Sequence, residues 1–509
     1  MCDLAPNLTK FNRPTRWLTS FIPRILFLVI FDFIELPMDP LGTFDIILAV
    51  NRNRVFNLLY LAIFLISSAL RLGLAITDRD PNDVVAIILQ QNRLPLTGEC
   101  EECFQPKVYY FIVAKAVEMA AINVHHEGSI ALALQLMNFA AVELTIILTY
   151  IFIKQLNPKY EKTGLIAFAL LAFNPALMTV SGTAFNDAFT ILFSSVAIYL
   201  FWIYLQNEKW GWLAASCIFV SLSLATKTNT WSTAIAILIV LFIKCAFDRR
   251  MIQSLVIVMF ILAVTLLTLL NPLSQYWTNI RNFGTPVTLN VVLEPLPSFF
   301  EKTAVRRPGI LSIQDGFFTF KFIELMESPR LTLAATDYPA FRTSFWADIY
   351  GTANSVHFLN SPDEWHTKPD FEVTRCIFIL AIIPTIALLL GMGISGIKLS
   401  KAIISSSIDG LRQQFFGLFD VISIGYIFFT IVLALRYRDY STINAKYMYP
   451  GILAYIYLFI VGVEGFFRFI SVHLKLISGL FITIILFLLV VYGIDVYHMI
   501  EHLYSLNVR

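Results

Sequence analysis

Long apolar segments recur along most of this 509-residue chain and constrain its fold more than any other feature. A bilayer core about 30 Å thick is crossed by a helix of roughly 20 apolar residues. Eleven stretches fit that length: 55–76, 131–153, 163–180, 185–205, 211–226, 229–247, 252–270, 376–396, 416–436, 448–468 and 475–498. We therefore predict an all-α polytopic membrane protein with about 11–12 transmembrane helices.

The twelfth candidate is the stretch 17–50, which is apolar but interrupted by Arg24, Asp32 and Glu35. Charges are costly at the middle of a bilayer. We interpret this stretch as interfacial or re-entrant, with a spanning helix as the alternative. The segment before it is polar, and no small-residue cleavage site follows, so we expect no cleavable signal peptide.

Composition supports the membrane class and excludes others. The chain is 57% hydrophobic and only 14% charged, whereas an average soluble domain is about a quarter charged. A formal charge of +2 is too small for a nucleic-acid-binding surface. The expected partners are membrane lipids and lipid-borne molecules, with no nucleic acid.

The orientation follows from the basic residues, which gather in cytoplasmic loops. Lysines and arginines cluster at 10–16, 52–54, 154–162, 244–250 and 398–412, which places the amino terminus inside. The exoplasmic face then receives the polar stretches 77–130, 181–187, 227–231, 271–375 and 437–447. We expect a multi-pass protein of the plasma (inner) membrane, or of the endoplasmic reticulum in a eukaryote.

These boundaries divide the chain into four predicted regions. Residues 1–54 form a cytoplasmic or interfacial segment, and residues 55–270 form a transmembrane module that includes the first exoplasmic loop, 77–130. Residues 271–375 form a large exoplasmic loop region, and residues 376–509 form a second transmembrane module.

Two cysteines lie close together in the first exoplasmic loop, in the sequence "ECEEC". A lone CxxC suits a disulfide, a redox pair or half a metal site. Because no second Cys or His pair stands at matching spacing, we expect Cys100 and Cys103 to form a disulfide or to remain free thiols. We predict no metal site and no cofactor, with the metal requirement left open.

Acidic residues occur at two predicted helix ends on the exoplasmic face. The stretch "TDRDPNDVV" supplies Asp78, Asp80 and Asp83, and "AFNDAF" supplies Asp187. Asp83 and Asp187 each stand where a carboxylate can cap a helix by accepting from free amide groups. Asp187 is equally suited to catalysis, because both roles place an acid at that boundary.

Cations occur on the same face, where the orientation rule disfavours them. Lys227 follows the fifth span, and Arg281, Arg438 and Lys446 lie further along the chain. A phosphate would hold Lys227 there, and so would a carboxylate such as Asp187. Arginine suits phosphate because its planar fork donates two hydrogen bonds at once. Cations and acids together suit a site that handles both a phosphate and a proton.

The order of these segments resembles the GT-C superfamily of integral membrane glycosyltransferases, which includes the protein O-mannosyltransferases and the aminoarabinose transferases. The similar segments are the acids of the first loop, "QPKVYYFI", "NPALMTVSGTAFND", "TK", "NIRNFGTP", "SFWADIYG" and "AKYMYP", spread over residues 55–470. Two of them depart from the family pattern. The common Asp-Glu pair of the first loop is "DRDP" here, and Lys446 stands where relatives carry arginine.

The resemblance implies transfer of a sugar from a polyprenyl- or dolichyl-phosphate donor to a lipid, glycan or protein acceptor, with inversion at the exoplasmic face. It implies Asp80 or Asp78 as the general base, with Asp187 as a second acidic candidate. Further roles are implied for Lys227, Arg281, Lys446 and Arg438 at the donor phosphate, and for Trp346, Tyr109 and Asn186 as sugar or acceptor contacts.

Three alternatives remain open, and one of them is another lipid-linked sugar enzyme, such as a polymerase or ligase that acts on a diphosphate carrier. A transporter also has many spans, and would place ionisable residues inside them; Glu143 and Glu464 are the candidates here. A non-catalytic membrane protein would explain the altered acidic motif. The large loop on one face and the lack of a repeat between the two halves favour the glycosyltransferase.

Overall fold

Helices build the part of the chain that the computed structural model describes, and that part contains no β-strand. The described residues are 44–77, 83–96, 99–100, 103, 105–122, 127–156, 160–248, 251–269, 271–284, 286, 313–327, 344–355, 371–437, 444–471 and 475–507. The predicted all-α class is confirmed for these residues. The expectation for residues 17–50 falls almost wholly outside them.

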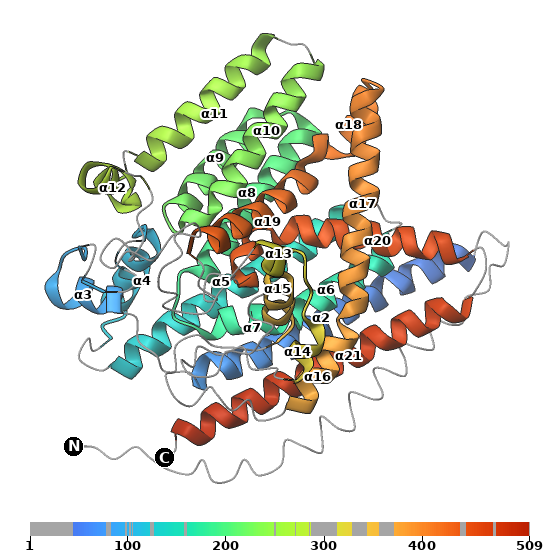
Figure 1. The fold of residues 1–509 in the computed structure, drawn as a ribbon, viewed down its shortest axis with the longest axis horizontal. Coiled ribbons are helices and arrows are strands. Elements are labelled where there is room, and N and C mark those ends of the chain that lie inside the picture. The colour runs from blue at the N-terminus through green and yellow to red at the C-terminus, as the bar shows by residue number, and fades with distance from the viewer. Residues whose placement is uncertain are drawn as a thin grey trace.

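The first half of the described chain forms a series of helices and short 3-10 turns, shown in blue to green in Figure 1. They are α2 (Phe44–Thr77), α3 (Asp83–Gln91), α4 (Val108–Met119), α5 (Glu127–Gln155), α6 (Glu161–Ala172), α7 (Pro175–Gly182), α8 (Asp187–Asn207), α9 (Trp210–Leu224), η2 (Thr228–Thr230), α10 (Trp231–Asp248), α11 (Met251–Leu269), η3 (Pro272–Ser274) and α12 (Tyr276–Phe283).

The second half begins with short helices and ends with long apolar ones. They are α13 (Ile313–Phe317), α14 (Phe322–Glu327), α15 (Phe345–Asn354), α16 (Phe371–Leu380), α17 (Ile382–Ile404), α18 (Ile408–Gln413), η6 (Phe415–Gly417), α19 (Leu418–Tyr437), η8 (Ala445–Gly451), α20 (Ile452–Ser471) and α21 (Lys475–Asn507). Helix α21 returns to pack beside α2, so the first and last helices of the described chain lie side by side (Figure 1).

All eleven predicted apolar stretches are helical, although 163–180 and 376–396 are each divided between two α-helices. Eight helices in the described residues are long and apolar enough to cross a membrane, and one further candidate is the bent pair α6 and α7. Helix α9 and the apolar part of α11, Leu255–Leu269, are shorter than the others. The chain is therefore an integral, multi-pass membrane protein.

The predicted span 163–180 is not one straight helix, because α6 and α7 meet at an angle of 46°. Pro175 begins α7 and has no backbone N–H to continue the ladder of α6. The Asn174 side chain caps α7 by accepting from the Leu177 backbone N–H at 2.9 Å. The predicted apolar stretch is helical, but Asn174 and Pro175 divide it into two helices.

Side-chain hydrogen bonds connect helices inside the bundle. Ser194 of α8 lies 2.6 Å from Ser223 of α9, and Thr233 of α10 lies 2.7 Å from the Tyr426 hydroxyl of α19. Such bonds between neighbouring helices add to van der Waals packing in a membrane, where no hydrophobic effect separates protein from lipid. Helix α8 is thus joined to α9, and α10 to α19, inside the bundle.

Candidate functional site

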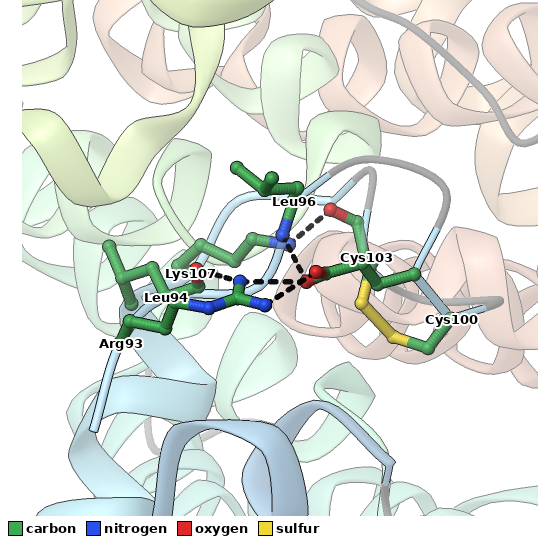
Figure 2. The surroundings of a disulfide bond; sticks show 7 residues. Arg93, Leu94, Leu96, Cys100, Cys103 and Lys107 are labelled. Carbon is green, nitrogen blue, oxygen red and sulfur yellow. Dashed lines mark hydrogen bonds and ion pairs between the residues drawn. A yellow bond between two sulfur atoms is a disulfide. The ribbon is translucent and has the colours of Figure 1, made fainter. Parts of the chain in front are cut away.

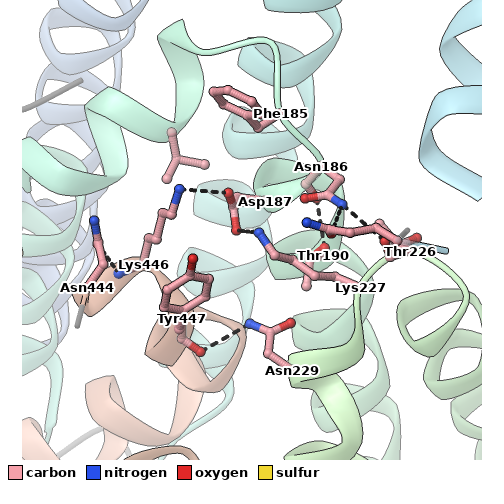
Figure 3. A network of polar contacts seen from close by, with 12 residues as sticks. Phe185, Asn186, Asp187, Thr190, Thr226, Lys227, Asn229, Asn444, Lys446 and Tyr447 are labelled. Carbon is pink, nitrogen blue, oxygen red and sulfur yellow. Dashed lines mark hydrogen bonds and ion pairs between the residues drawn. The ribbon is translucent and has the colours of Figure 1, made fainter. Parts of the chain in front are cut away.

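Asp187 lies at the centre of a charged cluster formed by three segments far apart in sequence. Its side chain is buried at the start of α8, where Lys227 Nζ lies 2.6 Å from Oδ1 and Lys446 Nζ lies 3.6 Å from Oδ2 (Figure 3). Lys227 follows α9, and Lys446 lies in η8. The carboxylate proposed from the sequence as a partner for Lys227 is therefore in place, and it binds Lys446 as well.

The backbone of η8 is fixed so that Lys446 reaches this carboxylate. The Asn444 side chain caps the turn by accepting from the Lys446 backbone N–H at 2.9 Å. The Ala445 backbone N–H donates to Thr352 Oγ1 of α15 at 3.0 Å. The Tyr449 hydroxyl donates to Asn174 at 2.9 Å, which ties η8 to the cap of α7.

These hydrogen bonds connect three segments that were each similar to a motif of the family. They are "NPALM", "SFWADIYG" and "AKYMYP", which supply α7, α15 and η8. Asn174 Nδ2 also donates to the Ala353 carbonyl of α15 at 3.0 Å. Helix α15 therefore helps to position η8, which contains Lys446.

Aromatic rings border the two ammonium groups. The Tyr447 ring centroid is 5.2 Å from Lys227 Nζ and 5.6 Å from Lys446 Nζ, and the Phe185 centroid is 5.6 Å from Lys446 Nζ. An ammonium over a ring face is attracted by the ring quadrupole. The rings also exclude water, which strengthens the electrostatic interactions of the cluster.

Two buried asparagines flank the cluster. Asn186 precedes Asp187, and its Nδ2 donates to Gln105 Oε1 at 2.6 Å and to the Thr226 carbonyl at 3.2 Å. Asn229 lies two residues after Lys227, and its Nδ2 donates to the Tyr447 carbonyl at 3.2 Å (Figure 3). The sequence analysis named Asn186 but missed Gln105, which begins the quoted segment "QPKVYYFI", and Asn229, which lies two residues after the quoted "TK".

The loop before α4 carries the two neighbouring cysteines. Cys100 and Cys103 form a disulfide (Figure 2), which decides between the two states expected from the sequence. Lys107 Nζ donates to the Cys103 carbonyl, and the Lys107 backbone N–H donates to the Leu273 carbonyl at 2.6 Å. The disulfide turn thereby leads directly into the segment that holds Gln105.

An ion pair also orders this loop. Arg93 donates to both carboxylate oxygens of Glu99, at 2.9 and 2.5 Å, and the Leu96 backbone N–H donates to Glu99 at 2.7 Å (Figure 2). The hydrogen bonds from Arg93, and then that from Leu96, lower the pKa of Glu99 to about 2. Hydrogen bonds to the charged form of a carboxylate favour that form.

The two other predicted sugar or acceptor contacts, Tyr109 and Trp346, lie on different helices. Tyr109 is fully buried on α4, with its ring 5.3 Å from that of Phe189 in the first turn of α8. Trp346 is 39% exposed on α15, and its Nε1 donates to the Phe317 carbonyl at 2.8 Å. Of the two, only Tyr109 packs against the helix that begins with Asp187.

The remaining predicted residues are placed as follows. Arg281 is exposed in the last turn of α12 and is not among the described contacts of Asp187. Asp83 is the first residue of α3, at the helix start expected from the sequence. Asp78, Asp80 and Arg438 lie outside the described residues. In the described part of the chain, no group of three or more His, Cys, Asp or Glu residues could hold a metal ion.

Three comparisons place the chain among known proteins. Residues 118–274 match the dolichyl-phosphate-mannose-protein mannosyltransferase family. No curated protein matches the chain. Among solved structures, the chain is similar to ArnT from Cupriavidus metallidurans, in the apo state and bound to undecaprenyl phosphate. Both are 12% identical with a TM-score of 0.42, over 90% of this chain and 76% or 77% of the ArnT chain.

The family match contains the central part of the charged cluster. Asn186, Asp187 and Lys227 fall within residues 118–274, whereas Lys446 lies outside that range. Over this segment the chain resembles the dolichyl-phosphate-mannose-protein mannosyltransferase family, which supports the resemblance found in the sequence for this part of the chain.

Proposed function

We propose that this protein is a membrane glycosyltransferase that transfers a sugar from a polyprenyl-phosphate or dolichyl-phosphate carrier to an acceptor. The observation that carries the proposal is the convergence of Lys227 and Lys446 on Asp187 at one end of the bundle. Two of these three residues lie in the segment that matches a dolichyl-phosphate-dependent family. The predicted orientation puts this end at the exoplasmic face.

The cluster suits an anionic leaving group. As the bond between the anomeric carbon and the phosphate oxygen breaks, the phosphate keeps the electron pair, and its negative charge grows. Lys227 and Lys446 would stabilise that charge, since preorganised cations act most strongly where charge develops. Asp187 would hold the two ammonium groups together before the donor binds, because it contacts both.

A second acid completes the proposed reaction. Asp80 or Asp78 would take the proton from the attacking hydroxyl while its oxygen bonds to the anomeric carbon on the side opposite the phosphate. This single displacement inverts the configuration of the anomeric carbon. A lipid, glycan or protein hydroxyl could serve as the acceptor.

Carrier binding tests the cationic part of the proposal. Purified protein in detergent is titrated with undecaprenyl phosphate, and binding is followed by thermal stabilisation. Lys227→Met and Lys446→Met should each weaken binding about 10- to 100-fold, as expected for loss of a charged hydrogen bond. Lys401→Met, at an exposed position near the end of α17, serves as the control. Equal affinity in all four proteins would refute the phosphate site.

Turnover tests the predicted base. A sugar-labelled polyprenyl-phosphate donor is incubated with the protein and a membrane extract as acceptor, and release of the unglycosylated carrier is measured. Asp80→Asn or Asp78→Asn should lower turnover about 10²- to 10⁴-fold while carrier binding is retained. Full turnover by both single variants and the double variant would exclude these residues as the base.

A further inference from the structure

Cys100 and Cys103 form a disulfide that adds little to the stability of the fold. The two residues are only three positions apart, so the bond closes a very short loop. The entropy that a disulfide removes from the unfolded chain grows with loop length and is smallest for such loops. Any larger effect of this bond must therefore come through the contacts of its loop.

One residue of the pair is within reach of a reductant. Cys100 is partly exposed, and so are its neighbour Glu99 and the Arg93 side chain that pairs with Glu99 (Figure 2). Cys103 is fully buried in the hydrophobic cluster that includes Tyr109 of α4. In the predicted orientation this loop faces the exoplasmic compartment, where disulfides persist. A thiolate from that side would therefore meet Cys100 first.

The buried half of the disulfide leads into a segment that is fixed at several points. Lys107 Nζ donates to the Cys103 carbonyl, as Figure 2 shows. The Lys107 backbone N–H donates to the Leu273 carbonyl at 2.6 Å, and the Val108 backbone N–H donates to the Ala225 carbonyl at 3.1 Å. The position of Cys103 is thus connected to the start of α4 and to the turn that follows α9.

Gln105 lies inside this fixed segment and reaches the charged cluster through Asn186. Its Oε1 accepts from Asn186 Nδ2 at 2.6 Å, and the same nitrogen donates to the Thr226 carbonyl at 3.2 Å. Asn186 directly precedes Asp187 in the chain. Thr226 directly precedes Lys227, so the shared amide joins the two segments whose side chains form the buried ion pair (Figure 3). A shift of the segment that carries Gln105 would therefore change the geometry of that pair.

We propose that Cys100 and Cys103 undergo reversible thiol–disulfide exchange with an exoplasmic dithiol, and that the disulfide form holds the charged cluster in the arrangement that binds the carrier phosphate. This inference rests on the proposed function, because it concerns the same cluster. In the reduced form only hydrogen bonds and packing hold the loop, so Gln105 is less firmly fixed and the cluster is less well preorganised. The oxidised protein therefore binds the carrier more tightly than the reduced protein.

The exchange takes place in two steps. A thiolate of the dithiol attacks the sulfur of Cys100, which forms a mixed disulfide and releases Cys103 as a thiolate that takes up a proton. The second thiolate of the reagent then attacks the reagent sulfur of the mixed disulfide and releases Cys100, which is protonated in turn. The protein gains two electrons and two protons, and the dithiol loses them as it becomes a disulfide.

Carrier binding by the oxidised and the reduced protein tests the inference. Purified protein is titrated with undecaprenyl phosphate in the absence and in the presence of dithiothreitol. Reduction should weaken binding about 3- to 10-fold, the range for loss of one hydrogen bond. By linkage, the carrier should shift the equilibrium between dithiothreitol and the cysteine pair towards the protein disulfide by the same factor. Mass spectrometry of the protein after thiol labelling measures that shift.

Three variants separate the switch from a general effect of the reductant. The double variant Cys100→Ser, Cys103→Ser should bind the carrier as weakly as the reduced natural protein and should not respond to dithiothreitol. Gln105→Met, which lacks the acceptor for Asn186, should bind weakly in both redox states. Cys376→Ser is the matched control, because Cys376 is a free cysteine on α16, outside the loop. It should keep both the natural affinity and the full response to reduction.

Four results would overturn the inference. The first is a disulfide that dithiothreitol does not reduce in the folded protein, and the second is equal affinity of the oxidised and reduced proteins for the carrier. The third is tight binding by the double serine variant. The fourth is loss of cooperative thermal unfolding on reduction, because weak binding would then reflect general loss of structure. Failure of the oxidised natural protein to bind bare carrier would instead refute the proposed function.

Discussion

Replacing Gly391 by alanine should force α17 and α20 apart. A β-carbon at Gly391 would lie 1.7 Å from the backbone oxygen of Leu458, and one at Gly462 would lie 1.8 Å from that of Ala387. Ordinary van der Waals contact begins at 3.4 Å, so the helices would have to separate by roughly the difference, about 1.7 Å. Close approach through small residues is how membrane helices gain packing energy.

The expected cost is about 1–3 kcal/mol, the usual penalty for overpacking a well-packed interface. Thermal unfolding in detergent measures it, with Gly393→Ala as the matched control on the same helix. A β-carbon at Gly393 meets nothing within 4 Å. Since alanine favours a helix over glycine by about 1 kcal/mol, the control should be neutral or stabilising. Equal stability of the two variants would refute the packing argument.

The paired glycines also predict non-additivity. A β-carbon at Gly391 would lie 3.0 Å from the Gly462 backbone nitrogen, and one at Gly462 would lie 2.8 Å from that of Gly391. One separation of the helices relieves both clashes, so the double alanine variant should cost less than the two single costs added together. Because η8 leads directly into α20, the shift should also weaken the carrier binding proposed for Lys446.

Three further predictions concern the loop before α4 and the bundle interior. Reducing the Cys100–Cys103 disulfide should cost at most about 2 kcal/mol, because the closed loop is short, and thermal unfolding with and without reductant measures this. Tyr426→Phe should cost about 0.6 kcal/mol in the same assay, the average for a hydrogen bond between membrane helices; a change above about 2 kcal/mol would contradict it. Because its folded pKa is depressed, the Glu99 carboxylate should stay ionised as pH falls until about 2, and Arg93→Ala should raise that pKa in an NMR titration.

The sequence predicted what depends on local composition. The apolar runs became helical, because a membrane span must satisfy its backbone hydrogen bonds within itself, although the breaks inside 163–180 and 376–396 were not predicted. Asp83 and Asp187 were expected at helix starts, and both begin helices. The sequence analysis offered two partners for Lys227, a phosphate or a carboxylate such as Asp187. The second was predictable because the ends of nearby spans lie on the same face, and the structure contains that pair.

Contacts between distant segments could not be predicted in the same way. Lys446 reaches Asp187 only because Thr352 and Asn174 fix the turn that carries it, and none of these bonds leaves a periodic signal in the sequence. Asn229 was overlooked because a single asparagine in a loop is usually solvated. It is buried here, and its bond to Tyr447 spans more than two hundred residues.

The ionisable residues inside the spans bear on the choice between an enzyme and a transporter. Glu143 was a candidate for a transport pathway, but its Oε1 lies 2.6 Å from Arg71 Nε of α2. Arg71 also donates to Ser67 and to the carbonyl of Ala172, the last residue of α6. That carbonyl has no hydrogen-bond partner within its helix, because α6 ends there and α7 begins in a new direction. The pair therefore stabilises the break next to Asn174, whose cap and bond to Tyr449 hold η8 in place. The Arg71–Glu143 pair thus stabilises a bent helix and does not line a transport pathway. This structural role favours an enzyme with its site at one end of the bundle over a transporter.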